Sequence, residues 1–211
     1  MKHIVWDWNG TLFHDIDAVV DATNEVFRPY GLSPMDAAGF RAVYSRPIWA
    51  CYERLLGRAL AEGEWEALDR SFHDNYHRLM LTCDLAEGVR EGLKRWDETG
   101  GSQSLLSMWR HERLVPAVAE FGIAPHFRRV DGLREAESGG HKARYMAAHV
   151  QALGVDPATV TVIGDSVDDA DAAVHVGARA ILYTGGMTTR RDLEATGFPV
   201  VDSLAEALDL A

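Results

Sequence analysis

The sequence predicts an α/β protein with a doubly wound, mostly parallel sheet and an inserted helical segment. Two observations lead to this fold class. From about residue 84 onward, strand-like apolar runs alternate with helical patterns, which implies parallel strands joined by helices on both faces of the sheet. Between residues 15 and 83, apolar residues recur instead at three- and four-residue spacings. We therefore expect a core domain at 1–14 and 84–211 and an α-helical cap domain at 15–83.

The expected elements follow in chain order. A buried strand at 3–6 comes first, and the cap helices follow at about 19–27, 35–43, 48–60 and 65–79. In the core, strands are expected at 103–107, 128–131, 159–164, 179–183 and 199–201, and helices at 86–98, 110–121, 140–153, from about 168 and at the end of the chain. Ligands bind such sheets at the carboxyl ends of the strands. The first candidate site residues, which fall at such ends, are therefore Asp7, Ser107 and Asp165.

Composition and charge narrow the classes of function. The 211 residues are 47% hydrophobic and 25% charged, as in ordinary globular proteins, and the net charge is −11. This acidity disfavours binding to nucleic acid or to an anionic membrane. No apolar run reaches the roughly 20 residues that span a bilayer, and no signal-like segment precedes Asp7, so a cytoplasmic location is expected. Cys51 and Cys83 are too few for a disulfide framework and are expected to be reduced.

Two motifs carry chemistry. The first strand runs directly into Asp7-Trp8-Asn9-Gly10-Thr11-Leu12, which presents a carboxylate at a strand end, before a glycine turn and a hydroxyl that is expected to orient it. The segment Gly164-Asp165-Ser166-Val167-Asp168-Asp169 places further carboxylates at a second strand end. Two or three carboxylates that meet at one sheet edge suit Mg²⁺, which prefers oxygen ligands. We expect a nucleophile and a metal site at this edge.

These motifs, with Ser107 and Lys142 in order between them, resemble those of the haloacid dehalogenase-like hydrolases, and the layout is most similar to the phosphoglycolate phosphatase group. The resemblance implies a Mg²⁺-dependent phosphatase that hydrolyses a small phosphate monoester, a small phosphorylated metabolite, through an aspartyl-phosphate on Asp7. It implies phosphoryl contacts from Ser107 and from Lys142, an exposed side chain at the start of a helix. The metal ligands that it implies are Asp7, Asp165, Asp169 and the main-chain carbonyl of Asn9, whereas Asp168 and Asp171 are expected to be exposed acids.

Two positions depart from the family pattern. Asn9 stands where the family usually has a second Asp, and Met108 stands where it usually has Asn. An amide neither donates nor accepts a proton as a carboxyl group does, so the acid/base step lacks its usual group. The alternative is that the protein is weakly active or non-catalytic and binds a phosphorylated ligand or a partner protein. His14, seven residues after Asp7, is a candidate substitute as proton carrier.

Residues of the cap bear on the choice of substrate. Arg46, in a Pro-containing break between cap helices, is a candidate to bind a substrate carboxylate or second phosphate, and a plain surface role is the open alternative. His73 and His77 share a helix face as zinc-binding pairs do, but no third ligand is evident, so a solvated cap face is expected. Phosphonatases of this family use a cap Lys, and no Lys lies between Lys2 and Lys94. Metal-free dehalogenases would not need the second acidic pair, Asp165 and Asp169. Neither phosphonate cleavage nor dehalogenation is therefore expected.

Overall fold

One parallel sheet forms the centre of the core, in the strand order β5-β4-β1-β6-β7-β8. The computed structural model describes residues 1–134 and 140–211. The strands are β1 His3–Trp6, β4 Ser102–Arg110, β5 Val130–Leu133, β6 Val160–Gly164, β7 Arg179–Tyr183 and β8 Val200–Val201. The predicted α/β class and the parallel sheet are confirmed.

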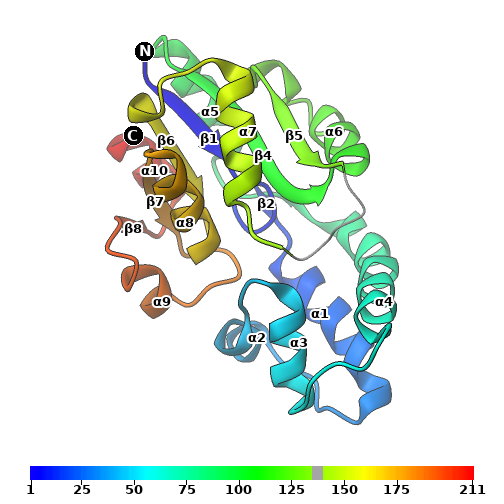
Figure 1. Cartoon of the computed structure of the whole chain (residues 1–211). Coiled ribbons are helices and arrows are strands. Elements are labelled where there is room, and N and C mark those ends of the chain that lie inside the picture. Colours follow the sequence, from blue (N-terminus) through cyan, green and yellow to red (C-terminus); the bar gives the residue numbers. More distant parts are fainter. Residues whose placement is uncertain (135–139) are drawn as a thin grey trace.

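Helices cover both faces of this sheet, and Figure 1 shows α7 and α8 in front of it. Alternate residues of β1 point to opposite faces, so that Ile4 and Trp6 pack in one apolar layer and Val5 packs in the other. One face is covered by α5 Val89–Glu98, α6 His111–Glu120 and α10 Leu204–Leu210, and the other by α7 Ala143–Leu153, α8 Val167–Val176 and α9 Arg190–Glu194.

The other four α-helices of the described residues form a separate lobe, the cap, at one end of the sheet (Figure 1). They are α1 Ile16–Phe27, α2 Ala37–Val43, α3 Ile48–Leu56 and α4 Glu64–Leu79. α1 packs along α4, and apolar side chains such as Phe27, Cys51 and Tyr52 give the lobe its own small core. Where the chain enters and leaves the lobe, β2 Phe13–His14 and β3 Asp84–Leu85 pair antiparallel. This ribbon supports the division at 15–83, which stays a prediction.

Several element boundaries differ from the sequence prediction. β4 continues to Arg110, so Ser107 lies inside a strand and not at its end, and the pairing of β4 with β5 shifts register beyond Leu106. α3 ends at Leu56 because Gly57 turns the chain with φ 67°. The ribbon of β2 and β3 and the short helix α9 were not predicted, since so few residues show no periodicity. Among the described residues, no helix is long and apolar enough to cross a membrane.

Candidate active site

Three carboxylates meet at the carboxyl edge of the sheet. Asp7 follows β1 and Asp165 follows β6, and these strands are parallel neighbours in which Trp6 pairs with Ile163. Asp169 joins them from the first turn of α8. Oxygen atoms of the three side chains all lie within 4.8 Å of one another. The structure therefore brings together the three side chains that the sequence singled out as metal ligands.

Asp165 is fixed by its neighbours on the two loops beside it. Its Oδ1 accepts a hydrogen bond from Thr11 Oγ1 (3.1 Å), and its Oδ2 accepts one from the Met187 amide (2.6 Å). Gly10 has φ 73°, and a Cβ at this position would lie 2.7 Å from Asp165 Oδ2, so only glycine fits between the loop and the carboxylate. The expectation that Thr11 orients Asp7 is wrong, because its hydroxyl holds Asp165 instead.

Lys142 bridges two of the carboxylates. Its Nζ lies 2.6 Å from Asp7 Oδ1 and 2.5 Å from Asp169 Oδ1. Contrary to the prediction of an exposed lysine, its side chain is only 4% exposed, because α7 begins directly over the cluster. Asp168 was predicted to be exposed and is buried: it accepts from the Lys142 amide (2.9 Å) and pairs with His141 (3.0 Å). Asp168 therefore anchors the segment that carries Lys142, whereas Asp171 is exposed as expected.

The electrostatics of this cluster favour an added cation. Burial raises the pKa of Asp7 to about 6 and raises the pKa of Asp165 well above its usual value, with Asp7 and Asp169 adding like-charge repulsion. Burial opposes the charge of Lys142, but Asp169 and Asp7 outweigh it and raise its pKa. Three carboxylates thus face one ammonium group. This donor set of carboxylate oxygens fits Mg²⁺, and the residues that would hold the ion are Asp7, Asp165 and Asp169.

Asn9 and Ser107 lie beside the cluster, on the loop after β1 and in β4. Ser107 is buried, and its Oγ is 3.5 Å from Asn9 Oδ1 and accepts from the Trp109 amide (3.0 Å). Both side chains line the same cavity as Asp7 and Lys142. The structure thus brings the predicted phosphoryl-binding residues together, whereas the predicted metal contact of the Asn9 carbonyl stays a prediction.

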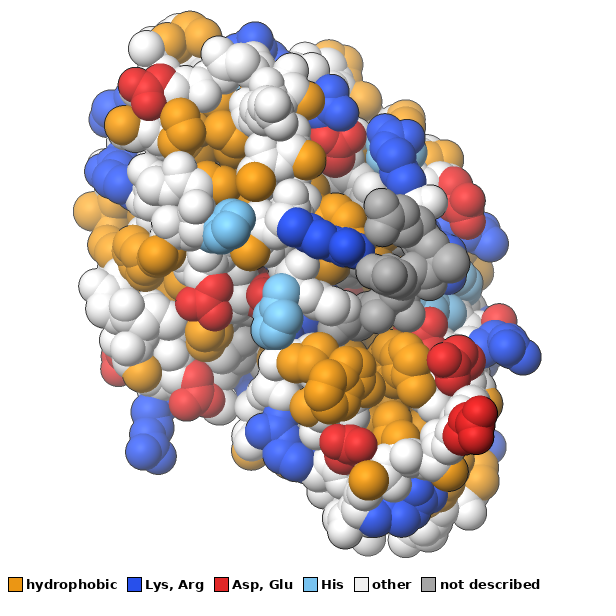
Figure 2. All heavy atoms as spheres, in the orientation of Figure 1, with side chains coloured by type: hydrophobic (Ala, Val, Ile, Leu, Met, Phe, Trp, Pro, Cys, Tyr) orange, Lys and Arg blue, Asp and Glu red, His pale blue; other side chains and the backbone are white. Residues whose placement is uncertain are grey.

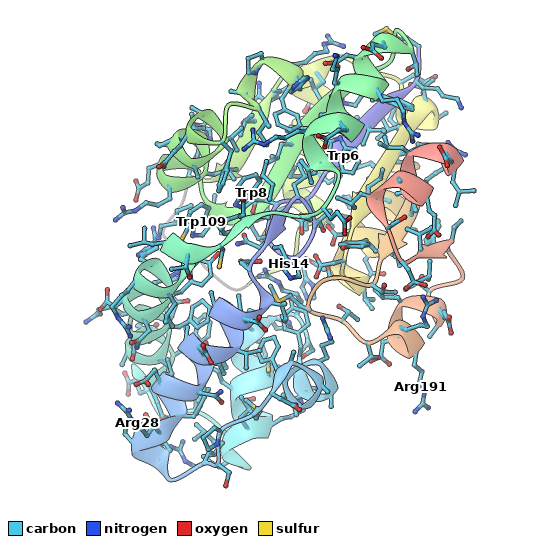
Figure 3. The ribbon with its side chains drawn as sticks, turned by 180° about the vertical axis from the view of Figure 1, so that it is seen from behind. Trp6, Trp8, His14, Arg28, Trp109 and Arg191 are labelled. Carbon is cyan, nitrogen blue, oxygen red and sulfur yellow. The ribbon has the colours of Figure 1, made fainter. Side chains whose placement is uncertain are left out.

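Two residues that the sequence did not single out hold the Asn9 side chain. Asp15 is fully buried, and its Oδ2 accepts from Asn9 Nδ2 (2.7 Å) and from the Tyr76 hydroxyl (2.5 Å). Burial raises the pKa of Asp15 despite these hydrogen bonds. Asp15 precedes α1, where an Asp usually caps a helix, but its carboxylate makes no capping bond. That ordinary role at a helix start concealed it in the sequence, while the neighbouring His14 is exposed on β2 and does not line the cavity (Figure 3).

The cap covers the site, and residues of the cap and the core together line a cavity of about 150 Å³. Arg46 lines it together with Tyr44, and its Nη1 reaches the Gly140 carbonyl on the core (3.4 Å). Burial raises the pKa of Tyr44 to about 12. Arg41 of α2 donates from Nε to the carbonyl of Gly186 (2.7 Å), next to the residue whose amide holds Asp165. The predicted specificity residue therefore lies at the site, and a second cap arginine contacts the loop beside the acidic cluster.

His73 and His77 do not form the solvated face that was predicted. Both are half-buried on α4, His73 lines the cavity, and the His77 ring lies 6.3 Å from that of Trp109, next to the helix in Figure 3. A groove beside the cavity runs along the junction of the two lobes, where Figure 2 shows hydrophobic, histidine and cationic side chains near one another. Within the described residues, the acidic cluster is the group with metal-binding spacing, and the two histidines are not part of it.

Known proteins with the same layout place this site in a family. A family model described as haloacid dehalogenase-like hydrolase matches residues 4–183. The chain belongs to this family. A phosphoglycolate phosphatase of Caulobacter vibrioides is 29% identical over 190 residues, which cover 88% of this chain and 80% of that protein. One from Chromobacterium violaceum is 26% identical over 219 residues, which cover 100% of this chain and 96% of that protein.

A solved structure extends the similarity to the whole fold. A haloacid dehalogenase-like family hydrolase from Streptococcus pneumoniae matches with a TM-score of 0.83 at 17% identity, covering 100% of this chain and 98% of that one. The family and the fold that the motifs predicted are confirmed, and the chain is an enzyme of the hydrolase class.

Proposed function

We propose that the protein is a Mg²⁺-dependent phosphatase that hydrolyses a small phosphate monoester through an aspartyl-phosphate on Asp7. The observation that carries this proposal is the meeting of Asp7, Asp165 and Asp169, with the buried ammonium group of Lys142 paired to Asp7 and Asp169. The similarity to phosphoglycolate phosphatases agrees with it. A site of this charge pattern suits phosphoryl transfer, which depends on positioning and on neutralised charge.

The residues divide the reaction between them. Asp7 Oδ attacks phosphorus, the bond from phosphorus to the alcohol oxygen breaks, and the alcohol oxygen takes a proton from solvent. Water then displaces Asp7, its protons leave with the inorganic phosphate, and the Asp7 carboxylate is restored. Lys142 Nζ and Ser107 Oγ contact the phosphoryl oxygens, and Asp169 holds Lys142 in place. When bound, Mg²⁺ supplies positive charge that reduces the repulsion between the Asp7 carboxylate and the substrate phosphate.

The cavity supports a small substrate. Its volume of about 150 Å³ admits a phosphate and a short alcohol, and Arg46 is the cap cation beside it. A carboxylate on the alcohol would pair with this guanidinium. Phosphoglycolate has this composition and is the first ester to test, because the similar proteins bear its name.

A second candidate function is feeble turnover or ligand binding without catalysis. The observation that favours it is the Asn9 amide, which stands beside the phosphoryl site where a carboxyl group would supply a proton. Such acid–base assistance contributes roughly 10²–10⁴-fold in rate. A low turnover rate that rises steeply as the leaving group improves would indicate this function.

The test is hydrolysis of phosphoglycolate, acetyl phosphate and p-nitrophenyl phosphate with Mg²⁺ and with EDTA. We expect Mg²⁺-dependent release of phosphate, inhibition by beryllium fluoride, and loss of both in Lys142→Ala. Lys94→Ala is the matched control, because Lys94 is exposed on α5, with its Nζ 3.9 Å from Glu98. Hydrolysis that persists in EDTA, or inhibition that survives in Lys142→Ala, would contradict the assignment.

A further inference from the structure

The hydrogen bonds around Asn9 determine which way its amide points. An ionised carboxylate only accepts hydrogen bonds, so the NH₂ group of Asn9 must face Asp15 Oδ2, 2.7 Å away. The same NH₂ group also donates to the hydroxyl of Tyr76 (2.7 Å), which in turn donates to Asp15 Oδ2 (2.5 Å). Three groups therefore form a closed set of hydrogen bonds with the amide nitrogen at its centre.

The other end of the amide faces the phosphoryl site. Asn9 Oδ1 lies 3.5 Å from Ser107 Oγ, in the cavity that also contains Asp7 and Lys142. A carbonyl oxygen is an acceptor, so the site receives a hydrogen-bond acceptor at this position and not an N–H donor. An acceptor repels phosphate oxygens, but it binds the hydroxyl hydrogen of a water or an alcohol.

The carboxylate behind Asn9 depends on every one of its donors. Asp15 is 0% exposed, and within the described chain it is held by three neutral donors: the Gly10 amide (2.8 Å), Asn9 Nδ2 and the Tyr76 hydroxyl. A buried carboxylate that loses a hydrogen-bond donor is strongly destabilised. Tyr76 of α4, Asp15 at the start of α1 and Asn9 of the loop after β1 are therefore fixed together, although they come from three separate segments.

We propose that Asp15 and Tyr76 are positioning residues that hold the Asn9 amide with Oδ1 toward the phosphoryl site, where Asn9 orients the water that hydrolyses the aspartyl-phosphate. This inference rests on the proposed function. Asn9 takes no proton in this role: it accepts a hydrogen bond from the water, whose oxygen then attacks phosphorus. Because Tyr76 belongs to α4, the amide is held this way only while the cap rests on the core.

The arrangement also explains why an amide stands at position 9. With Asp at position 9, a carboxylate oxygen would lie about where Asn9 Nδ2 lies, 2.7 Å from Asp15 Oδ2. Two buried carboxylates at this distance repel each other. The substitution Asn9→Asp that the family pattern suggests therefore needs a second change, Asp15→Asn, which restores an amide–carboxylate pair with the two groups exchanged.

The test is a double-mutant cycle on the full-length protein with Mg²⁺. Native protein, Asn9→Asp, Asp15→Asn and the double variant are compared by kcat on acetyl phosphate and by Tm. We expect each single variant to lose about tenfold in kcat and to melt lower than native, and the double variant to recover at least the native kcat and to melt above both single variants. A purely structural role of Asp15 would lower Tm without this rescue of kcat.

Tyr76→Phe tests the cap contribution by removal of one hydroxyl group. We expect kcat and KM to fall together, by about fivefold, so that kcat/KM changes less than twofold and the phosphoenzyme accumulates, because the water step slows and the steps before it do not. Tyr30→Phe is the matched control, since Tyr30 is an exposed cap tyrosine outside the cavity.

Each outcome distinguishes the inference from the function beneath it. If Asn9→Asp alone equals the double variant in kcat, or if the two substitutions are additive in both kcat and Tm, the inference is overturned. If native protein hydrolyses none of the esters, the proposed function fails; the Tm values of the same four proteins then still decide whether residues 9 and 15 are coupled as the structure requires.

Discussion

The central sheet holds two buried polar networks of opposite character, one that starts at its amino end and one at its carboxyl end. At the amino end, His3 of β1 binds Ser102 Oγ through Nδ1 (2.7 Å) and Ser104 Oγ through Nε2 (2.8 Å). Ser104 also binds His149 Nε2 (2.8 Å), and His149 Nδ1 contacts Asp131 (2.8 Å). Both nitrogens of the His3 ring and of the His149 ring therefore have a partner. At the carboxyl end, three carboxylates converge, Lys142 pairs with Asp7 and Asp169, and the pKa values of Asp7 and Asp165 are raised.

The comparison shows that residue types alone do not identify a site. Asp131, His149 and Ser104 follow one another as the groups of a serine hydrolase do, yet Ser104 is fully buried and no substrate reaches it. Its network satisfies its own hydrogen bonds and stabilises the fold. The acidic cluster is destabilised by its own charges and lines a cavity. A surplus of like charge beside open space distinguishes the functional end from the structural end.

The strongest test of this contrast is Asp7→Asn. We expect turnover to fall by on the order of 10⁴-fold or more, because the nucleophile is lost. In Mg²⁺-free buffer at pH 7 we expect the same variant to be more stable, by about 1–3 kcal/mol, since a neutral group replaces a carboxylate whose pKa is raised by burial to about 6. Activity assays and thermal unfolding measure the two effects. A less stable variant would mean that the contact with Lys142 outweighs the repulsion.

Next in size is the metal affinity. Asp165→Asn should weaken Mg²⁺ binding by about 100-fold in a calorimetric titration, because it removes one of three converging carboxylates. Asp168→Asn should weaken it less, since Asp168 holds the Lys142 amide and His141. Asp171→Asn, at an exposed position of the same helix, is the control and should leave affinity unchanged. Equal losses in all three variants would show that the metal does not bind at this edge.

The sequence predicted which acidic residues meet at the carboxyl edge of the sheet, and it did so for a physical reason. Strands that run parallel bring their ends to one edge, so Asp7 and Asp165 could be placed together from the order of the elements alone. The helix that Lys142 opens could also be read from the sequence. The burial of the Lys142 side chain could not be predicted, because it depends on how α7 approaches the cluster. The contact of Asp168 with the Lys142 amide could not be predicted either.

The contacts that cross between lobes were beyond the sequence. Tyr76 appeared as one apolar position in a helical stripe, yet its hydroxyl accepts a hydrogen bond from Asn9 of the core loop and donates one to Asp15. Arg41 likewise meets Gly186 at a separation of 145 residues. The amino-end network was missed for the same reason, since the pairing of His3 with Ser102 follows from strand register. Periodicity gives the faces of an element, whereas such contacts depend on the assembled layers.

The amino-end network should make stability depend on pH through His3. Burial lowers its pKa to about 4, with His149 and Arg128 adding positive charge nearby. The unfolded chain therefore binds a proton at higher pH than the folded one, and stability falls as the pH drops from about 6.5 to about 4, by roughly 3 kcal/mol in total. Urea unfolding at several pH values measures this slope. His3→Gln should flatten it, and a slope equal to that of native protein would assign the effect to other groups.

The smallest expected effect separates stability from function most cleanly. Ser104→Ala removes the one hydroxyl that both His3 Nε2 and His149 Nε2 contact, and two buried ring nitrogens then lack a partner. We expect a loss of about 2 kcal/mol in the free energy of unfolding, because each unsatisfied buried group retains its desolvation penalty. Ser102→Ala is the matched control and should cost less, since it deprives only His3 Nδ1. The network shares no residue with the acidic cluster and lines no part of its cavity, so kcat at a temperature well below Tm should stay at the native value in both variants. A tenfold fall in kcat for Ser104→Ala, with folding intact, would mean that the two networks are coupled through the sheet and that the division between a structural and a functional end does not hold.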